Sequence, residues 1–508
     1  MSTAAAPPLA RPERVAAIDL GSNSARVVVV EVEAGGHLEV VEELRTPLRL
    51  ALALGPDGRL PADAVAATIA ALHEFMAVAH GAGAQRIRAV ATAALRDARN
   101  ADAILAPVRD QMGLTIDVID AQAEAERSFV GAIYGLPVEH GLLVDIGGGS
   151  MEVVHFRDRA VEATWSFPFG VLRMWDRCLS DDPPGEAELR RLAADVRDDL
   201  RRAGVPALAG GDVLVGTGGS VRNLAKMDRR GRPYPIHRLH GYAIGARRLE
   251  ALLTGFAGRT LDERRLLPGL NPDRADAIGA GAAVLQGVLD AAGAAEVLVA
   301  GQGIREGIIR SVALPSLPPP EEVRRASLRS IARRFARWDE ERAAHRAATA
   351  AMLQSELDPE MTPELRELLG HAAYVLDIGT AIDYYNRHRQ TAAILAVTDL
   401  NGFSHRHTAL IAALIRTAEK PSPGVRPYRP LLTKADAPAL ERAALILAIA
   451  DELGRRVVPD RDPHVSCVVE PERVQLTTQG DGRRQLSRLS ARFREAFGRG
   501  LVVDGRPA

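Results

Sequence analysis

Hydrophobic positions in the first third of the chain alternate between strand-like and helix-like spacing. Residues 14–20 and 25–33 are short apolar or β-branched runs with the composition of buried strands. Residues 61–83 repeat apolar positions at helical spacing and end at glycines, which predicts an amphipathic helix. A strand at 86–95 and a strand leading into a helix over 115–135 follow. This alternation predicts an α/β fold.

The pattern restarts at Leu142. LLVDIGGGSMEVVHF can be laid over the opening stretch without a gap, so that Asp145 falls on Asp19 and Ser150 falls on Ser24. Chance similarity between two glycine-rich turns is one explanation. We favour the other, in which two related α/β domains face each other.

Two further segments, 212–227 and 296–310, switch from a strand through a glycine loop to a helix. A proline-rich stretch at 313–322 then interrupts the chain as a linker does, and the sequence after it is mostly helical. The predicted boundaries are α/β domains over 14–137 and 138–314 and a helical region over 321–508. A small α+β tail, a strand pair and a helix, is expected from about residue 430.

Composition narrows the class of protein. A chain of 508 residues is too long for one core, and a net charge of −1 gives no preference for DNA or acidic membranes. Cys178 and Cys467 fit no metal or disulfide framework. No apolar run of 18 residues and no signal-peptide core is apparent, so we expect a cytoplasmic protein without a membrane partner.

The DLGSNS loop that follows the first strand has the chemistry of an anion site. β-Branched residues come directly after it, and Gly-Lys-Ser/Thr is missing, so a β-hairpin is favoured over a P-loop or a Rossmann turn. Exposed backbone N–H groups at such a tip bind phosphate, and Asp19 at the strand end suits Mg²⁺. A tight hairpin with a turn-capping aspartate is the structural alternative.

DIGGGS supplies a second aspartate followed by donors. Two facing hairpins would hold a phosphate chain from both sides in a cleft between the domains, with 216–220 and 301–307 as its wall. The candidate phosphate-binding residues are Gly21, Ser22, Asn23, Ser24, Gly147, Gly148, Gly149, Ser150, Gly218 and Gly219.

Four motifs in order resemble one known family. AIDLGSNSARVVV, VDIGGGSMEVV, GTGGSVRNLAK and GQGIREGII are similar to those of the exopolyphosphatase/guanosine pentaphosphate phosphatase family. The resemblance spans about residues 14–312 and continues more weakly to about 420. It implies two duplicated actin-like, ribonuclease-H-like domains with an interdomain cleft, and a homodimer.

The resemblance also implies roles for acidic and basic residues. The family's base glutamate aligns with Glu124, although the usual Glu-Glu-Ala-Arg segment is AEAER here, which leaves Glu126 as the other candidate. A solvated glutamate in a first helical turn is the structural reading of Glu124. The implied metal-associated acids are Asp145 and Glu152, with Asp19 as a further candidate for Mg²⁺ or another divalent cation.

Two arginines, Arg26 and Arg96, match family arginines that face the cleft and could neutralise charge on the transferred phosphoryl group. Ordinary surface arginines are the alternative for each. Arg305 is equally suited to a structural acid or to a ligand.

The helical region resembles phosphohydrolases of the HD type but lacks their imidazoles. Leu376 stands before Asp377 where histidine is diagnostic, and Gln390 occupies a second position that is commonly histidine. A two-metal site is therefore hard to assemble. We expect a degenerate HD-like scaffold, with His371, His388, His405 and His407 as helix-surface or polar-packing residues.

The leading hypothesis is an exopolyphosphatase that removes terminal phosphate from inorganic polyphosphate. The alternative is the same chemistry on guanosine pentaphosphate, which yields the tetraphosphate. A sugar-kinase-like or actin-like ATPase and an inactive phosphate-chain sensor complete the set of hypotheses.

Overall fold

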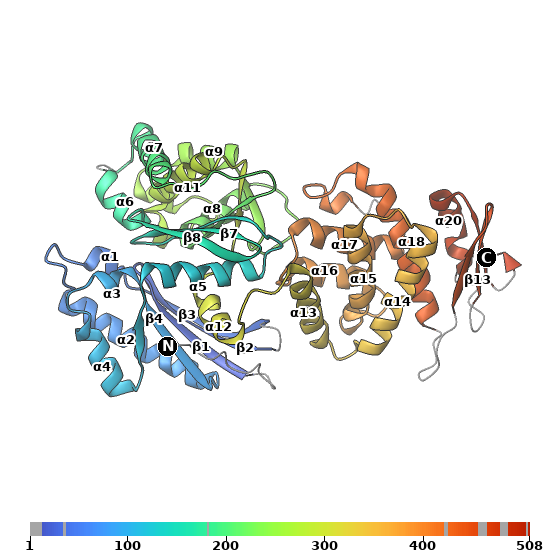
Figure 1. Ribbon diagram of the computed structural model, residues 1–508, viewed down its shortest axis with the longest axis horizontal. Helices are drawn as coiled ribbons and strands as arrows, with labels where there is room; N and C mark the ends of the chain where they lie inside the picture. Colours follow the sequence, from blue (N-terminus) through green and yellow to red (C-terminus); the bar gives the residue numbers. More distant parts are fainter. Residues whose placement is uncertain are drawn as a thin grey trace. The chain divides into compact units, whose positions relative to one another are not determined.

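The computed structural model describes most of the chain, in two compact units (Figure 1). The described residues are 13–33, 37–179, 182–420, 425–455, 465–477, 486–503 and 506–507. The first unit runs to Arg232 and resumes from Leu239 to Val323. The second takes the short segment Pro233–Arg238 and continues from Arg324. The sequence-based boundaries did not anticipate this short excursion.

The first sheet has five strands in the order β3-β2-β1-β4-β5. These are β1 (Glu13–Leu20), β2 (Ser24–Val32), β3 (Leu38–Pro47), β4 (Arg86–Ala91) and β5 (Ile116–Val118). β1 and β2 form the antiparallel hairpin expected around residues 21–23, and β4 pairs parallel with β1. The helices are α1 (Leu50–Ala53), α2 (Ala62–Gly81), α3 (Ala93–Asp97), α4 (Asp102–Met112) and α5 (Ala121–Tyr134).

The second sheet has six strands in the order β10-β11-β9-β6-β7-β8. They are β6 (Gly141–Ile146), β7 (Met151–Arg157), β8 (Ala160–Phe167), β9 (Val213–Thr217), β10 (Tyr242–Gly245) and β11 (Glu296–Val299). The series β8-β7-β6-β9-β11 repeats the strand order of the first sheet, and β10 is an added edge strand.

The remaining helices of the first unit belong to the second half of its sequence. They are α6 (Val171–Cys178), α7 (Glu186–Arg202), α8 (Gly219–Arg230), α9 (Ala246–Phe256), α10 (Leu261–Arg265), η1 (Pro272–Arg274), α11 (Ile278–Ala292) and α12 (Ile304–Ala313). Both predicted strand–loop–helix switches are present as β9–α8 and β11–α12.

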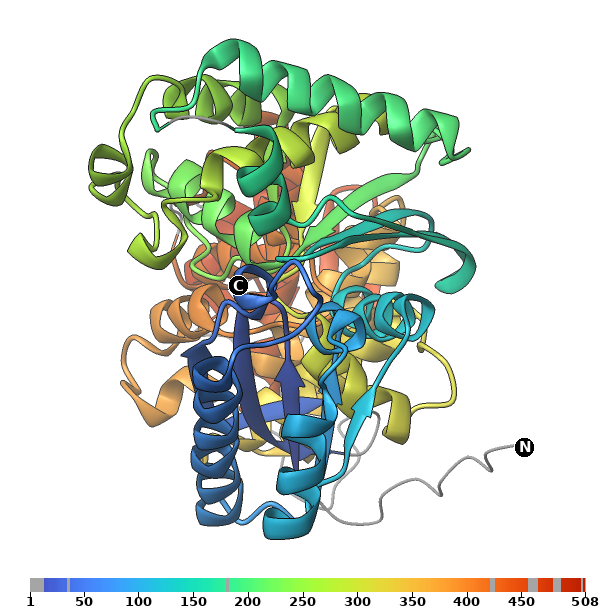
Figure 2. The ribbon, with the colours of Figure 1, turned by 90° about the vertical axis from the view of Figure 1, so that its left-hand side faces the viewer.

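Side-chain alternation along β1 explains how the first sheet is covered. Ala16 and Ile18 enter a core with α2 and α4 on one face, and Figure 2 shows α2 lying along this sheet. Val15 and Ala17 enter a second core with Ile308 of α12 on the other face. By its length and hydropathy α2 alone among the described helices could cross a membrane, but here it buries part of its surface in the first core.

The two halves of the first unit exchange helices. α5, which follows the first sheet in sequence, packs Phe129 against Val154 and Phe156 of the second sheet. α12, which follows the second sheet, covers the first. The two helices cross closely, since a methyl group at Gly131 would lie 1.8 Å from the carbonyl oxygen of Gly303. A methyl group at Gly307 would lie 1.7 Å from that of Arg127.

The second unit is mostly helical. Its principal elements are α13 (Pro320–Arg333), α14 (Glu340–Leu357), α15 (Pro363–Val375), η2 (Ile378–Ala381), α16 (Arg387–Val397), α17 (His405–Glu419) and α18 (Ala437–Gly454). The expected tail is present as β12 (Ser466–Val469), β13 (Arg473–Thr477) and α20 (Ser490–Phe497). It is extended by β14 (Gly500–Val503) and β15 (Arg506–Pro507), and short helices lie at η3 (Arg426–Tyr428), η4 (Lys434–Asp436) and η5 (Ser487–Leu489).

A buried network of opposite charges lies inside the helical unit. Asp377 and Asp451 are 8% and 5% exposed, and Arg387 bonds to both carboxylates. Arg346 lies 2.6 Å from Asp377 and 3.4 Å from Asp451. Two guanidinium groups therefore stand between two buried acids.

We expect Gly131→Ala to destabilise the first unit, because its methyl group meets backbone rather than a movable side chain. Overpacking of this kind costs about 1–3 kcal/mol or more, and it should also reduce activity by displacing α5. Urea denaturation and turnover measure the two effects. Gly255→Ala on α9 is the matched control, since nothing lies within 4 Å of that site. Equal stability of the two variants would contradict the close crossing of α5 and α12.

Candidate active site

A pocket of about 130 Å³ lies between the two sheets of the first unit. Both hairpin tips, the β9–α8 turn and the start of α12 line it. The tips contact each other, because a methyl group at Gly148 would lie 3.2 Å from Asn23 Cβ, and one at Gly149 would lie 2.9 Å from Ser22 Oγ. The structure thus places the two hairpins face to face, as the sequence led us to expect.

Nearly all sequence-predicted residues come together in this pocket. Those that line it are Asp19, Gly21, Ser22, Asn23, Ser24, Arg26, Glu124, Asp145, Gly147, Gly148, Gly149, Ser150, Gly218 and Gly219. Arg96 and Glu152 do not line the pocket: Arg96 contacts Glu124, which does, and Glu152 is 2% exposed. Glu126, the other candidate base, is exposed on α5 instead.

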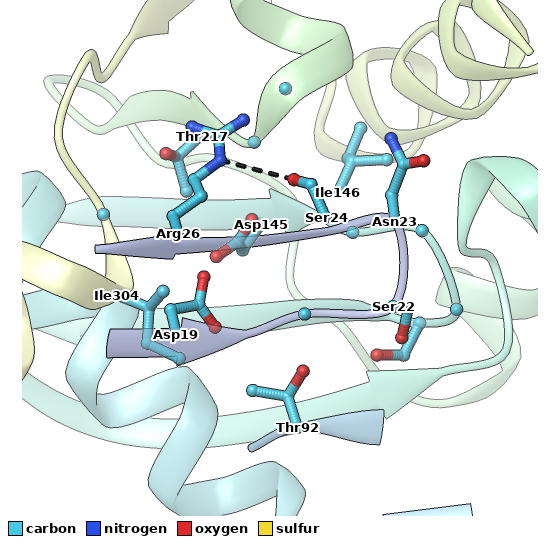
Figure 3. A pocket seen from close by; sticks show the side chains of 18 of the residues that line it. Asp19, Ser22, Asn23, Ser24, Arg26, Thr92, Asp145, Ile146, Thr217 and Ile304 are labelled. Atoms are coloured by element: carbon cyan, nitrogen blue, oxygen red, sulfur yellow. Dashed lines mark hydrogen bonds between the residues drawn. The ribbon is translucent and has the colours of Figure 1, made fainter. Parts of the chain in front are cut away.

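Strand alternation directs the acids into the pocket. Asp19 follows Val15 and Ala17 on the α12 face of the first sheet, whereas Asp145 follows Leu143 on the α5 face of the second. Figure 3 shows the carboxylates of Asp19 and Asp145 directed into the same space. The Oδ1 atom of Asp19 is buried and has no hydrogen-bond partner.

Burial makes these carboxyl groups reluctant to ionise. It raises the pKa of Asp19 to about 6, with Arg305 and Arg26 opposing the shift and Asp145 adding to it. Burial also raises the pKa of Asp145, against a hydrogen bond from Ser128. The pKa of Glu152 lies well above its usual value because of burial and the charges of Glu124 and Asp145.

Glu124 stands in the first turn of α5 at the pocket edge. Asp120 caps this helix by accepting a 2.8 Å hydrogen bond from the Ala123 N–H. Arg96 Nη1 donates to Glu124 Oε2 at 3.1 Å and to the Ile119 carbonyl at 2.9 Å. Burial nevertheless raises the pKa of Glu124 to about 7, although Arg96 opposes the shift. A carboxyl group with this pKa accepts a proton effectively near neutral pH.

Four arginines share the pocket with these acids. Arg26, Arg222, Arg274 and Arg305 all line it. Burial lowers the pKa of Arg26 to about 9, with repulsion from Arg222, Arg305 and Arg274 adding to the shift. Burial and repulsion from Arg222 and Arg45 lower the pKa of Arg274 to about 10.

Three of these four arginines form no ion pair within the described residues. Arg305 lines the pocket and also forms an ion pair with Glu43 at 3.0 Å. Among the residues that the structure describes, Arg26, Arg222 and Arg274 form no ion pair with a carboxylate; Arg26 bonds only to Ser24 (Figure 3). A cluster of partly buried cations without ion pairs favours a ligand with several negative charges.

Sequence reasoning missed Arg222 and Arg274. Arg222 lies in the first turn of α8, where it donates to the Gly301 carbonyl at 3.2 Å. Arg274 comes from a turn that is distant in sequence, and its guanidinium lies against Gly219. A methyl group at Gly219 would lie only 2.1 Å from the Arg274 guanidinium. Both arginines lie in stretches that carry the family resemblance, Arg222 in GTGGSVRNLAK and Arg274 in NPDRADAIGAGAAVL, and this was the signal that could have found them.

The acids suit a hard divalent cation in part. Among the described residues, no group of three or more His, Cys, Asp or Glu side chains is arranged to hold a metal ion. Mg²⁺, however, uses one or two carboxylates together with phosphate oxygens and water. The buried, unpartnered Asp19 Oδ1 and the neighbouring Asp145 fit that mode of binding.

Comparison with known proteins places this arrangement in a family. Residues 28–315 match the Ppx/GppA phosphatase family, and residues 323–478 match Ppx/GppA phosphatase, domain III. The chain belongs to the Ppx/GppA phosphatase family. The resemblance found in its motifs is therefore confirmed, as are a mixed α/β first unit and a helical C-terminal domain III.

Individual members of this family match nearly three fifths of the chain. The chain is 33% identical to exopolyphosphatase 2 of Mycobacterium tuberculosis over 316 residues, which are 59% of this chain and 98% of that protein. It is 30% identical to exopolyphosphatase 1 of that organism, over 58% and 87% of the two chains. The Ppx/GppA crystal structure from Aquifex aeolicus matches with a TM-score of 0.53 at 28% identity, covering 59% and 98%.

Replacement of Glu124 by glutamine should stabilise the first unit at high pH. The folded protein binds the Glu124 proton more tightly than the unfolded chain does, because the pKa is raised from 4.5 to about 7. The free energy of unfolding therefore falls as pH rises through this window and stays lower above it. We expect Glu124→Gln to raise it by about 1–3 kcal/mol near pH 8 and to change it little near pH 4.

Urea denaturation of both proteins at the two pH values measures this difference. Glu126→Gln, on the exposed side of the same helix, is the control and should show no pH-dependent gain. A stability change of Glu124→Gln that is equal at both pH values would show that Glu124 titrates normally.

Proposed function

We propose that this chain is an exopolyphosphatase, which hydrolyses the terminal phosphate of inorganic polyphosphate with the help of Mg²⁺. The observation that carries the proposal is that carboxyl groups and four arginines line one pocket, and that three of these arginines form no ion pair within the described residues. The similarity to the two mycobacterial exopolyphosphatases supports it.

In the proposed reaction Glu124 takes a proton from the water that attacks the terminal phosphorus. The bond from that phosphorus to the bridging oxygen breaks, and the electron pair stays with the shortened chain. Arg26, Arg222 and Arg274 are placed to neutralise charge on the phosphates, and Arg96 holds the Glu124 carboxylate. Asp19, Asp145 and Glu152 are the proposed residues for Mg²⁺, which would supply further charge neutralisation.

Guanosine pentaphosphate is the second candidate substrate. Among the described residues that line the pocket, none is aromatic. The pocket therefore offers charges and backbone donors but no ring on which a guanine could stack. This favours the inorganic chain.

The finer architecture is also a proposal. The shared strand order of the two sheets supports duplicated actin-like domains. Asp377 and Asp451, which are paired with arginines, support a degenerate HD-like domain in the helical unit. The homodimer and the cytoplasmic location remain predictions of the sequence, and light scattering of the purified protein tests the first.

Phosphate release from long polyphosphate and from guanosine pentaphosphate, each with Mg²⁺ and with chelator, tests the activity. We expect the parent to hydrolyse polyphosphate without any nucleotide or acceptor, which would argue against a kinase. Glu124→Gln should lose about 10²–10⁴-fold in turnover, the usual contribution of a general base. Glu126→Gln should remain near normal. Near-normal turnover of Glu124→Gln would refute the assigned base, and hydrolysis of neither substrate by the parent would refute the enzyme.

Arg222→Met should weaken polyphosphate binding rather than the chemical step. Loss of one charged hydrogen bond to phosphate predicts a rise in KM on the order of 10-fold or more, together with a shallower dependence of KM on salt. Steady-state kinetics at several salt concentrations measure both. Arg230→Met, at the exposed end of the same helix, is the matched control. An unchanged KM for Arg222→Met would place the phosphate chain elsewhere.

A further inference from the structure

Ser128 lies one helical turn after Glu124 on α5. Residues four positions apart share a helix face, so both side chains are directed toward the second sheet. Ser128 is 1% exposed, and its hydroxyl donates a 2.6 Å hydrogen bond to Asp145 Oδ2. The helix that presents the proposed base therefore also holds an acid of the second hairpin.

The Ser128 hydroxyl bonds outside its own helix. Buried serine and threonine in helices commonly bond to a carbonyl of the preceding turn. Thr68 of α2 does so with Ala64 at 2.7 Å, and Thr349 of α14 with His345 at 3.1 Å, whereas Thr391 of α16 reaches the Leu376 carbonyl outside its helix. The bond recorded for Ser128 likewise leaves its helix and reaches a strand of the facing sheet.

The two carboxylate oxygens of Asp145 have different surroundings. Oδ2 is taken by Ser128, while Oδ1 lies on the side of Gly218, where a methyl group would be 3.2 Å from it. Gly218 and Asp145 both line the pocket. Within the described part of the chain no side-chain hydroxyl donates to Asp19, whose Oδ1 atom is buried without a partner. Asp145 is thus oriented by a hydroxyl in a way that Asp19 is not.

We propose that Ser128 is a positioning residue that orients Asp145 toward a divalent cation and fixes this acid relative to Glu124. The inference rests on the proposed function in one respect, because it takes Asp145 as a cation ligand. It adds a residue outside the pocket lining, and that residue acts only through the carboxylate it holds. Partners that orient metal ligands in this way typically change metal affinity 10–100-fold when they are removed.

Direct Mn²⁺ binding by the full-length protein, followed by the paramagnetic resonance signal of free Mn²⁺, is the principal test. We expect Ser128→Ala to raise the dissociation constant for Mn²⁺ by about 10–100-fold, and Ser128→Thr, which keeps the hydroxyl, to restore most of the affinity. Thr68→Val removes a buried hydroxyl that bonds only to its own helix, so it is the matched control and should bind Mn²⁺ as the parent does.

Phosphate release as a function of Mg²⁺ concentration provides the second readout. In Ser128→Ala the Mg²⁺ concentration for half-maximal rate should rise, while the rate at saturating Mg²⁺ recovers more than that of Glu124→Gln. Unchanged Mn²⁺ affinity in Ser128→Ala overturns the proposal, as does an equal loss in Ser128→Thr or no Mn²⁺ binding by the parent. A parent that binds Mn²⁺ but hydrolyses neither substrate refutes the proposed function, while the Mn²⁺ comparison still decides the role of Ser128.

Discussion

The close crossing of α5 and α12 is the contact on which the geometry of the pocket depends. Each helix follows one sheet in sequence and packs on the other, and Gly131 and Gly307 let their backbones meet. The exchange carries the first turn of α5, with Glu124, to the acids of the second hairpin. It also carries the first turn of α12, with Arg305 and Glu306, to Asp19 of the first hairpin. Without it, each sheet would keep its own helix, and neither helix would reach the opposite acid.

The pocket concentrates charge at a cost to stability. The cross-strand partner of Asp19 is Arg26, whereas that of Asp145 is Glu152, so two hairpins of the same shape present opposite charges at equivalent positions. Burial opposes ionisation of both acids of the second hairpin, and the arginines repel one another. A phosphate chain bound together with a divalent cation, as proposed above, would reverse both penalties, because the phosphates would meet the arginines and the cation would meet the acids. The unfavourable charges of the free protein would then contribute to its affinity for such a ligand.

The sequence predicted those features that are local. The pattern of a strand, a small polar turn and a second strand occurs twice, 126 positions apart. The structure has a β-hairpin at each of the two places. Arg274 was missed because its place against Gly219 depends on how a distant turn folds back. Ser128 was missed because its partner is set by which sheet α5 covers, and adjacency in sequence favoured the first sheet. The alternation of side chains on β6 and β7 would have placed Asp145 and Glu152 on one face, but it does not say which helix covers that face.

The helical unit neutralises two buried acids with arginines of its own. Asp377 and Asp451 are buried, so their negative charges need positive partners. Arg346 and Arg387 provide these partners, and each of them pairs with both carboxylates. Although burial opposes ionisation, these guanidinium groups hold the pKa of Asp377 at about 2. Burial and the charge of Arg387 lower the pKa of His388 to about 4, so this histidine is neutral at physiological pH. To bind Asp377 and Asp451, a divalent cation would have to displace the guanidinium groups of Arg346 and Arg387, which already pair with both carboxylates. The same two acids therefore join α14, α16 and α18 through their ion pairs with Arg346 and Arg387.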